Sequence, residues 1–159
     1  LQANRGVLAY RDLERLIDKV RFFGFYLAKL DFRDHSRKVQ KALGEIFPGE
    51  NLAEDILLKK IISAPRSIRP AGLSSESKDI LDQLQTIKEV QDKTDPHILG
   101  NYILSMTESP ADILALFYLA KQKGLVKISK KKVIQSRIRI IPLFETPGRI
   151  MELAATKRK

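Results

Sequence analysis

Two stretches of the chain carry apolar residues every three or four positions, with charged residues between them. Residues 10–22 place Leu13 and Ile17 on one side, and residues 75–91 continue the same spacing. This period is typical of a helix that buries one face. We therefore expect two amphipathic helices, the first of them ending at Gly24.

Three further helices are predicted by residues that cap helix ends. Ser36 and Asn51 have short polar side chains that can accept hydrogen bonds from the free N–H groups of a first helical turn. Ser109 has the same character and is followed by a proline and an acid, while Gly124 provides a stop. The helices expected from these signals cover residues 36–47, 51–63 and 110–123, and a last one covers 147–155.

Short apolar runs between the helices predict buried strands. They cover residues 25–32, 101–106 and 138–143, and polar residues follow each run. Strands separated by helices predict an α/β fold built of parallel βα units. Three strands do not close a barrel, which needs about eight. We therefore expect residues 1–159 to be a single partial domain, a helix-rich part of a larger TIM-type (β/α) barrel.

The composition is that of an ordinary globular chain. Of its 159 residues, 43% are hydrophobic and 30% are charged, which is too apolar for general disorder. No apolar run reaches the ~18 residues that a membrane span needs. The chain has no cysteine, which excludes disulfides and thiolate metal sites and fits the cytoplasm. It begins at Leu1 without a methionine, so we expect it to be cut from something longer or processed.

The net charge of +10 is concentrated in one segment. Residues 121–139 hold eight Lys or Arg and no acid. Such a segment can bind nucleic acid, but this one has no interleaved aromatic residues to stack on bases. We expect a solvated helix end and loop here and no nucleic-acid partner. A small basic nucleic-acid-binding module stays as an alternative, and its affinity would fall steeply with salt.

Polar side chains at the strand ends are the candidates for chemistry. In βα folds the working residues lie at the carboxyl ends of strands, so the three polar segments should face one common mouth. Arg33 has a planar guanidinium that can bind a phosphate or a carboxylate with two hydrogen bonds. A structural ion pair with Asp31 or Asp34 explains an arginine at this position equally well.

Glu145 is a candidate ligand for a hard cation such as Mg²⁺ or Mn²⁺. A single carboxylate is not a metal site, and a solvated or helix-capping glutamate is the more common case. His35 stands beside Ser36, but neighbouring residues rarely reach each other in a hydrolase triad, and the G-x-S-x-G turn is absent. His97 is expected in a turn at a helix start.

Three segments of the chain resemble phosphoenolpyruvate carboxylase. Residues 23–36, FGFYLAKLDFRDHS, resemble that family's strand segment FG..L.(R/K)LD(I)RQ(E/H)S. Residues 102–115, YILSMTESPADILA, resemble its Y(V)ISM....SDVLA segment, and residues 141–146, IPLFET, resemble its (A)PLFET. Because the three occur in the family's order, the resemblance is specific, and it identifies the chain as a central slice of the catalytic barrel.

The resemblance implies an activity for the full-length parent enzyme. It is a lyase that converts phosphoenolpyruvate and bicarbonate to oxaloacetate and phosphate, a carbon dioxide fixation that feeds the tricarboxylic acid cycle. The implied cofactor is Mg²⁺ or Mn²⁺ with Glu145 as a metal ligand, and Arg33 is the implied phosphoenolpyruvate-binding residue. The resemblance also implies that this segment packs against the remainder of the parent chain. The full-length enzyme is expected to be a cytoplasmic homotetramer that does not bind a membrane. The alternative is another barrel enzyme that acts on phosphoenolpyruvate or pyruvate. The identity of the product would distinguish the two, since only the carboxylase forms oxaloacetate.

The chain departs from the family pattern at several points. Phe32 and Asp34 stand where the family usually has Ile and Gln, and residues 147–150 replace an acidic helix start. The family's HPTE-like histidine segment, GRGG loop and GYSDS segment have no counterpart in the sequence. We therefore assign no catalytic residue to this chain and expect it to be inactive alone.

Overall fold

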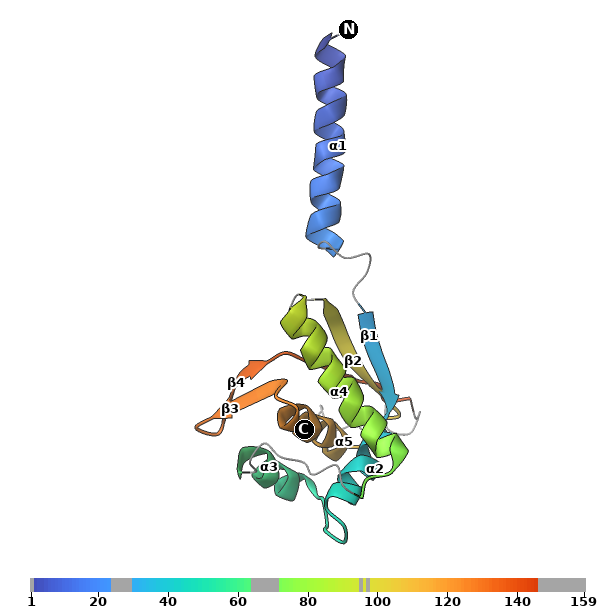
Figure 1. Ribbon diagram of the computed structural model, residues 1–159, viewed down its shortest axis with the longest axis vertical. Helices are drawn as coiled ribbons and strands as arrows, with labels where there is room; N and C mark the ends of the chain where they lie inside the picture. The colour runs from blue at the N-terminus through green and yellow to red at the C-terminus, as the bar shows by residue number, and fades with distance from the viewer. Residues whose placement is uncertain (1, 24–29, 64–71, 95, 97, 146–159) are drawn as a thin grey trace, which may run out of the picture. The chain divides into compact units, whose positions relative to one another are not determined.

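The computed structural model describes residues 2–23, 30–63, 72–94, 96 and 98–145 (Figure 1). The chain divides into two compact units, Leu1–Leu30 and Asp31–Lys159. The first unit contains α1 (Gln2–Phe23), which confirms the helix expected over residues 10–22 and extends it toward the amino terminus. The stop predicted at Gly24 lies outside the described residues. None of the helices in the described ranges combines the length and apolar character that crossing a membrane requires.

The second unit contains a three-stranded sheet in the order β1–β2–β5. Its strands are β1 (Leu30–His35), β2 (Leu99–Ser105) and β5 (Ile140–Pro142). β2 and β5 run parallel, with Tyr102 opposite Ile140 and Leu104 opposite Pro142. Parallel strands alternating with helices confirm the α/β class, and this sheet is compatible with part of a barrel.

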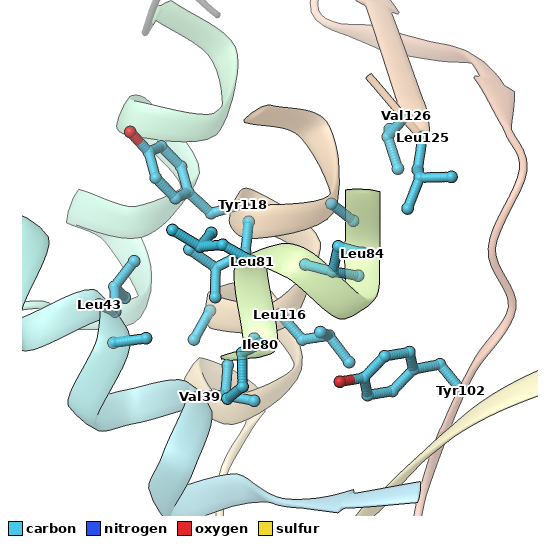
Figure 2. Close-up of a cluster of buried hydrophobic side chains, with 14 of the residues drawn as sticks. Val39, Leu43, Ile80, Leu81, Leu84, Tyr102, Leu116, Tyr118, Leu125 and Val126 are labelled. Atoms are coloured by element: carbon cyan, nitrogen blue, oxygen red, sulfur yellow. The ribbon is translucent and has the colours of Figure 1, made fainter. Parts of the chain in front are cut away.

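Four helices pack together in the second unit. They are α2 (Ser36–Ile46), α3 (Glu54–Ser63), α4 (Ser75–Lys93) and α5 (Pro110–Gln122). α5 contacts the other three, and its Leu116 and Leu119 are fully buried. Figure 2 shows the shared core, to which α2 contributes Leu43, α4 contributes Leu84 and β2 contributes Tyr102. The core is thus a helical layer packed on one face of the sheet.

The other face of the sheet is more open. Successive residues of a strand point to opposite faces. Tyr102 and Leu104 point toward the helices and are buried, whereas Arg33 and Ile141 point to the opposite face and are exposed. In a βα barrel the helices lie outside and the second face lines the interior.

The first strand is displaced from its expected position. A buried strand was expected over residues 25–32, but β1 begins at Leu30 and continues to His35, and the part before Leu30 lies outside the described residues. Asp34 is the one buried residue of β1, because this strand lies at the edge of the sheet and one of its faces is open. Arg33 therefore lies within the strand rather than after it.

The cap of α2 is also different from the prediction. His35, not Ser36, is the N-cap residue, and its Nδ1 accepts a hydrogen bond from the backbone N–H of Arg37 at 3.1 Å. The Ser36 hydroxyl instead donates to the carbonyl of Met106 at 2.6 Å. A serine hydroxyl can accept a hydrogen bond as a helix cap or donate one to a distant carbonyl. Ser36 donates because the turn after β2 brings the Met106 carbonyl within reach.

The other two predicted caps have different outcomes. α3 begins at Glu54, so Asn51 lies too far from the first turn to cap it. At α5 the predicted position is confirmed, because Ser109 is the N-cap residue, and its backbone N–H donates to the carboxylate of Asp112 at 3.0 Å. Gly124 follows the end of α5 with a φ of +81°, a conformation that favours glycine. The helix expected over residues 147–155 lies outside the described residues.

The basic segment starts in the last turn of α5, as predicted, and then forms a β-hairpin where a loop was expected. β3 (Val126–Ser129) pairs antiparallel with β4 (Lys132–Ser136), as Figure 1 shows. The two turn residues, Lys130 and Lys131, have φ values of 48° and 62°. Lysine rarely adopts this conformation, and the sequence signal of such a turn is usually glycine or asparagine, so the hairpin was missed. The lysines of β3, the turn and β4 are exposed, as expected, whereas Lys121 is buried.

Candidate functional site

Arg33 and Glu145 meet at the carboxyl end of the sheet. The Arg33 Nη2 donates to the Glu145 Oε1 at 2.9 Å, although 112 residues separate the two in sequence. Their side chains are 61% and 37% exposed, so both can be reached by a small solute. The structure thus brings together the two candidates that the sequence predicted.

Backbone hydrogen bonds hold the segment that carries Glu145. The Leu143 N–H donates to the Leu104 carbonyl at 2.9 Å, and the Thr107 N–H donates to the Leu143 carbonyl at 3.0 Å. These bonds continue the pairing of β2 with β5 beyond Pro142, the last residue of β5. Glu145 therefore follows a segment whose position is set by the central strand.

The polar residues after β2 have structural roles. The Thr107 hydroxyl donates to the Leu104 carbonyl at 2.8 Å. The Glu108 N–H donates to the Asp112 carboxylate at 2.9 Å, which ties the turn to the start of α5. Met106 has a φ of 52°, and its carbonyl accepts the hydrogen bond from α2 described above. The site is thus formed by the ends of β1 and β5, and this turn supports it.

The two acids beside Arg33 bind other groups. The Asp31 carboxylate accepts from the Asn101 backbone N–H at 2.7 Å. The Asp34 carboxylate accepts from the Tyr102 hydroxyl at 2.6 Å and lies 3.7 Å from the Lys38 Nζ. The predicted alternative, an Arg33 ion pair with Asp31 or Asp34, is therefore not what the structure shows.

Tyr102 is a residue of this region that was not predicted as part of the site. It is 1% exposed, and burial, followed by the hydrogen bond to and the charge of Asp34, strongly raises the pKa of its phenol. Its position in an apolar run explains its burial but not its polar partner. Only strand pairing brings Tyr102 beside Asp34, which is 68 residues away in sequence.

The donor set fits a divalent cation only in part. The Glu145 carboxylate is a hard oxygen donor, which Mg²⁺ and Mn²⁺ prefer. Among the described residues, no group of three His, Cys, Asp or Glu side chains is close enough to hold a metal ion. Glu145 can therefore supply one ligand, and a complete site needs further ligands.

His35 is not part of the Arg33–Glu145 contact. The Nδ1 of His35 is used in the cap of α2, which agrees with the sequence argument against a hydrolase triad. His97 lies outside the described residues.

Some of the basic residues of 121–139 also have structural partners. The Lys121 Nζ donates to the Ile61 carbonyl at 2.5 Å, and Lys121 is 7% exposed. The Arg137 Nη1 binds the Asp92 carboxylate at 2.5 Å. Lys121 therefore stabilises the packing of α5 on α3, and Arg137 stabilises the packing of the segment between β4 and β5 on α4.

Comparison with known proteins gives a consistent result. The family model described as phosphoenolpyruvate carboxylase matches residues 1–158. A phosphoenolpyruvate carboxylase from Synechocystis sp. is 32% identical in an alignment 148 residues long, which covers 85% of this chain and 14% of that protein. The residues matched by the family model include β1 and β5, the strands whose ends carry the candidate site. The chain therefore belongs to the phosphoenolpyruvate carboxylase family.

Proposed function

We propose that this chain is one part of a phosphoenolpyruvate carboxylase that forms oxaloacetate and phosphate from phosphoenolpyruvate and bicarbonate. The observation that carries the proposal is the contact between Arg33 and Glu145 at the carboxyl end of the sheet. An exposed cation and an exposed carboxylate at this edge match the anionic substrate and the divalent cation of that reaction. The family match supports this enzyme over another phosphoenolpyruvate-handling barrel or a nucleic-acid-binding module.

Arg33 binds and orients phosphoenolpyruvate in this proposal. Its guanidinium keeps its charge and offers parallel N–H groups to a phosphate or carboxylate. Glu145 accepts one of these N–H groups at 2.9 Å. When substrate binds, an anionic oxygen of phosphoenolpyruvate takes the place of Glu145, and the glutamate carboxylate becomes available to a cation.

Glu145 is one ligand of Mg²⁺ or Mn²⁺ in this proposal. A bound cation supplies positive charge close to the substrate, where negative charge develops on the enolate. Because one carboxylate is not enough, the other ligands come from the rest of a longer protein. This assignment gives the two charged groups separate roles, with Arg33 binding the substrate and Glu145 holding the metal.

A TIM-type barrel is the architecture we propose for the whole catalytic domain, with residues 1–159 as an internal part of it. The chain spans 14% of the Synechocystis relative, which leaves ample sequence for further strands. The exposed face of the sheet, with Arg33 and Ile141, becomes the inner face of such a barrel. We further propose a cytoplasmic homotetramer that supplies oxaloacetate to the tricarboxylic acid cycle.

The test measures oxaloacetate formation from phosphoenolpyruvate, bicarbonate and Mg²⁺ by a full-length protein that contains this chain. We expect Arg33→Ala and Glu145→Gln each to lower the rate by at least about a hundredfold, because each removes a charge from the site. Arg37→Ala and Glu54→Gln are matched controls at exposed positions of α2 and α3, and should leave the rate within about twofold.

Two results would contradict the proposal. One is a folded, metal-loaded full-length protein that forms no oxaloacetate. The other is a loss of activity in the control variants as large as in Arg33→Ala, since the effect would then not belong to the site. Circular dichroism of each variant verifies that the fold is intact.

A further inference from the structure

Both sequence neighbours of Arg33 contact the same residue, Tyr102 of the adjacent strand. The Phe32 ring stacks on the Tyr102 ring, with 6.2 Å between the ring centroids and 14° between the ring planes. The Asp34 carboxylate accepts the hydrogen bond of the Tyr102 hydroxyl at 2.6 Å. Phe32 and Asp34 are two residues apart in β1, so they point to the same face, and Arg33 between them points to the other.

We propose that Phe32, Asp34 and Tyr102 form a positioning unit that sets the direction of the Arg33 side chain. Among the described strands β1 pairs with β2 alone, so its contacts with β2 help to set how β1 is oriented. Contacts from both neighbours of Arg33 to one buried side chain of β2 oppose a rotation of β1 about its own axis. The consequence is a guanidinium held where it reaches Glu145 and, if the proposed function is correct, the substrate.

The charge of Asp34 is directed away from Arg33. The Asp34 side chain is 5% exposed. Besides the Tyr102 hydroxyl it contacts Lys38, whose Nζ lies 3.7 Å from the Asp34 Oδ1. The Asp34 backbone carbonyl also accepts a hydrogen bond from the Ser105 hydroxyl at 3.0 Å. A carboxylate placed next to Arg33 in sequence would otherwise compete for the guanidinium. Tyr102 and Lys38 bind it on the helical side, which leaves Arg33 to the open face.

The two departures from the family's strand pattern belong to this unit. Isoleucine at position 32 has no ring to stack on Tyr102, and glutamine at position 34 is neutral and one methylene longer than aspartate. Phe32 and Asp34 are therefore not independent replacements beside the arginine. They contact the same side chain, and we expect them to act together.

The test uses Tyr102→Phe, which keeps the ring and removes the hydroxyl. In the full-length protein we expect the KM for phosphoenolpyruvate to rise about tenfold, with kcat changed less than about twofold, because binding by Arg33 is weakened while the reacting groups are intact. The KM for bicarbonate should stay unchanged. Tyr118→Phe is the matched control, since Tyr118 is buried in the same core and its ring contacts Phe47, away from Arg33.

A double-mutant cycle distinguishes positioning from a general loss of stability. If Tyr102 acts through Arg33, Tyr102→Phe should have no further effect on the KM for phosphoenolpyruvate when Arg33 is already alanine. The proposal is overturned if the effect persists in the Arg33→Ala protein, or if Tyr118→Phe raises the KM equally. Asp34→Asn keeps an oxygen acceptor for the Tyr102 hydroxyl, and it should raise the KM less than Tyr102→Phe.

A second measurement does not depend on activity. In the 159-residue chain, we expect nuclear magnetic relaxation of the Arg33 side-chain Nε to show more motion in Tyr102→Phe than in Tyr118→Phe. An unchanged Arg33 signal would overturn the positioning role. If the full-length protein makes no oxaloacetate while the Arg33 signal changes as expected, the proposed function fails and the positioning role stands.

Discussion

Arg33 and Glu145 show how strand geometry decides the use of a charged residue. Arg33 has acids on either side of it within three residues, yet its guanidinium binds a carboxylate 112 residues away. The reason is that the side chains of Arg33 and Asp34 leave the strand on opposite faces. The binding partner of Arg33 thus depends on the face of the strand from which its side chain points, and not on which acids are near it in sequence.

The first prediction at the residue scale concerns Tyr102 at high pH. Its folded-state pKa is raised above the ordinary value of 10.0. A group with a raised folded pKa stabilises the fold fully below its unfolded pKa, and this contribution is lost as the pH rises toward the folded pKa. We therefore expect the free energy of unfolding of the wild-type chain to fall above about pH 10.

Urea titrations between neutral and alkaline pH measure this effect. The fall should be smaller in Tyr102→Phe, which has no phenol to ionise at this position. Because burial raises the pKa of both Tyr102 and Tyr118, the late-ionising part of the tyrosinate absorbance should be smaller in Tyr102→Phe than in the wild-type chain. An equal fall in both proteins would mean that Tyr102 ionises in the folded state as readily as in the unfolded state.

At the scale of elements, the β3–β4 hairpin is held together by its backbone more than by its side chains. All five residues of β4 are exposed. Val126 is buried, and the Arg137 N–H donates to the Leu125 carbonyl at 2.8 Å, which anchors the open end of the hairpin to the core. The exposed lysines add no packing, and they keep an edge strand soluble.

The turn of this hairpin gives the second prediction. Lys130 and Lys131 both have positive φ, which is unfavourable for lysine and favourable for asparagine and glycine. Lys130→Asn combined with Lys131→Gly should raise the free energy of unfolding by about 0.5–1 kcal/mol, as measured by urea denaturation.

The matched control for the turn is Lys132→Gly. It removes one lysine from the neighbouring strand position, where glycine offers no advantage, and it should be neutral or destabilising. If Lys132→Gly stabilises the chain as much as the double variant does, relief of charge repulsion rather than backbone conformation is the cause.

At the scale of the whole molecule, the largest buried cluster lies in the second unit, where α5 packs against α2, α3 and α4. Leu116 is fully buried in this cluster (Figure 2). Leu116→Ala should lower the free energy of unfolding by about 2–5 kcal/mol, through lost burial and the cavity it leaves. Ile134→Ala, at a β4 position that is 63% exposed, should change it by less than about 0.5 kcal/mol.

Thermal and urea denaturation of the 159-residue chain measure both variants. A small effect of Leu116→Ala would show that the helical layer is not packed as described. A large effect of Ile134→Ala would show that β4 is covered in solution.

The parts of the fold that the sequence predicted are those with strong local signals. α4 and α5 were predicted within a few residues, because their apolar period and the signals at the α5 ends agree. β2 was predicted because its residues are buried on a central strand. β1 was misplaced because an edge strand has no uniform burial, and the hairpin was missed because its turn has neither glycine nor asparagine.

The sequence by itself determined the α/β class, the core helices and the identity of Arg33 and Glu145 as candidates, because periodicity, capping residues and motif order are local properties of the chain. Only the tertiary structure decided that these two side chains meet, and that Asp34 binds Tyr102 instead of Arg33. Strand pairing joins residues about 70 to 110 positions apart and separates adjacent residues onto opposite faces. No local pattern specifies which distant strand a residue will lie beside, and at this site that neighbour determines the chemistry.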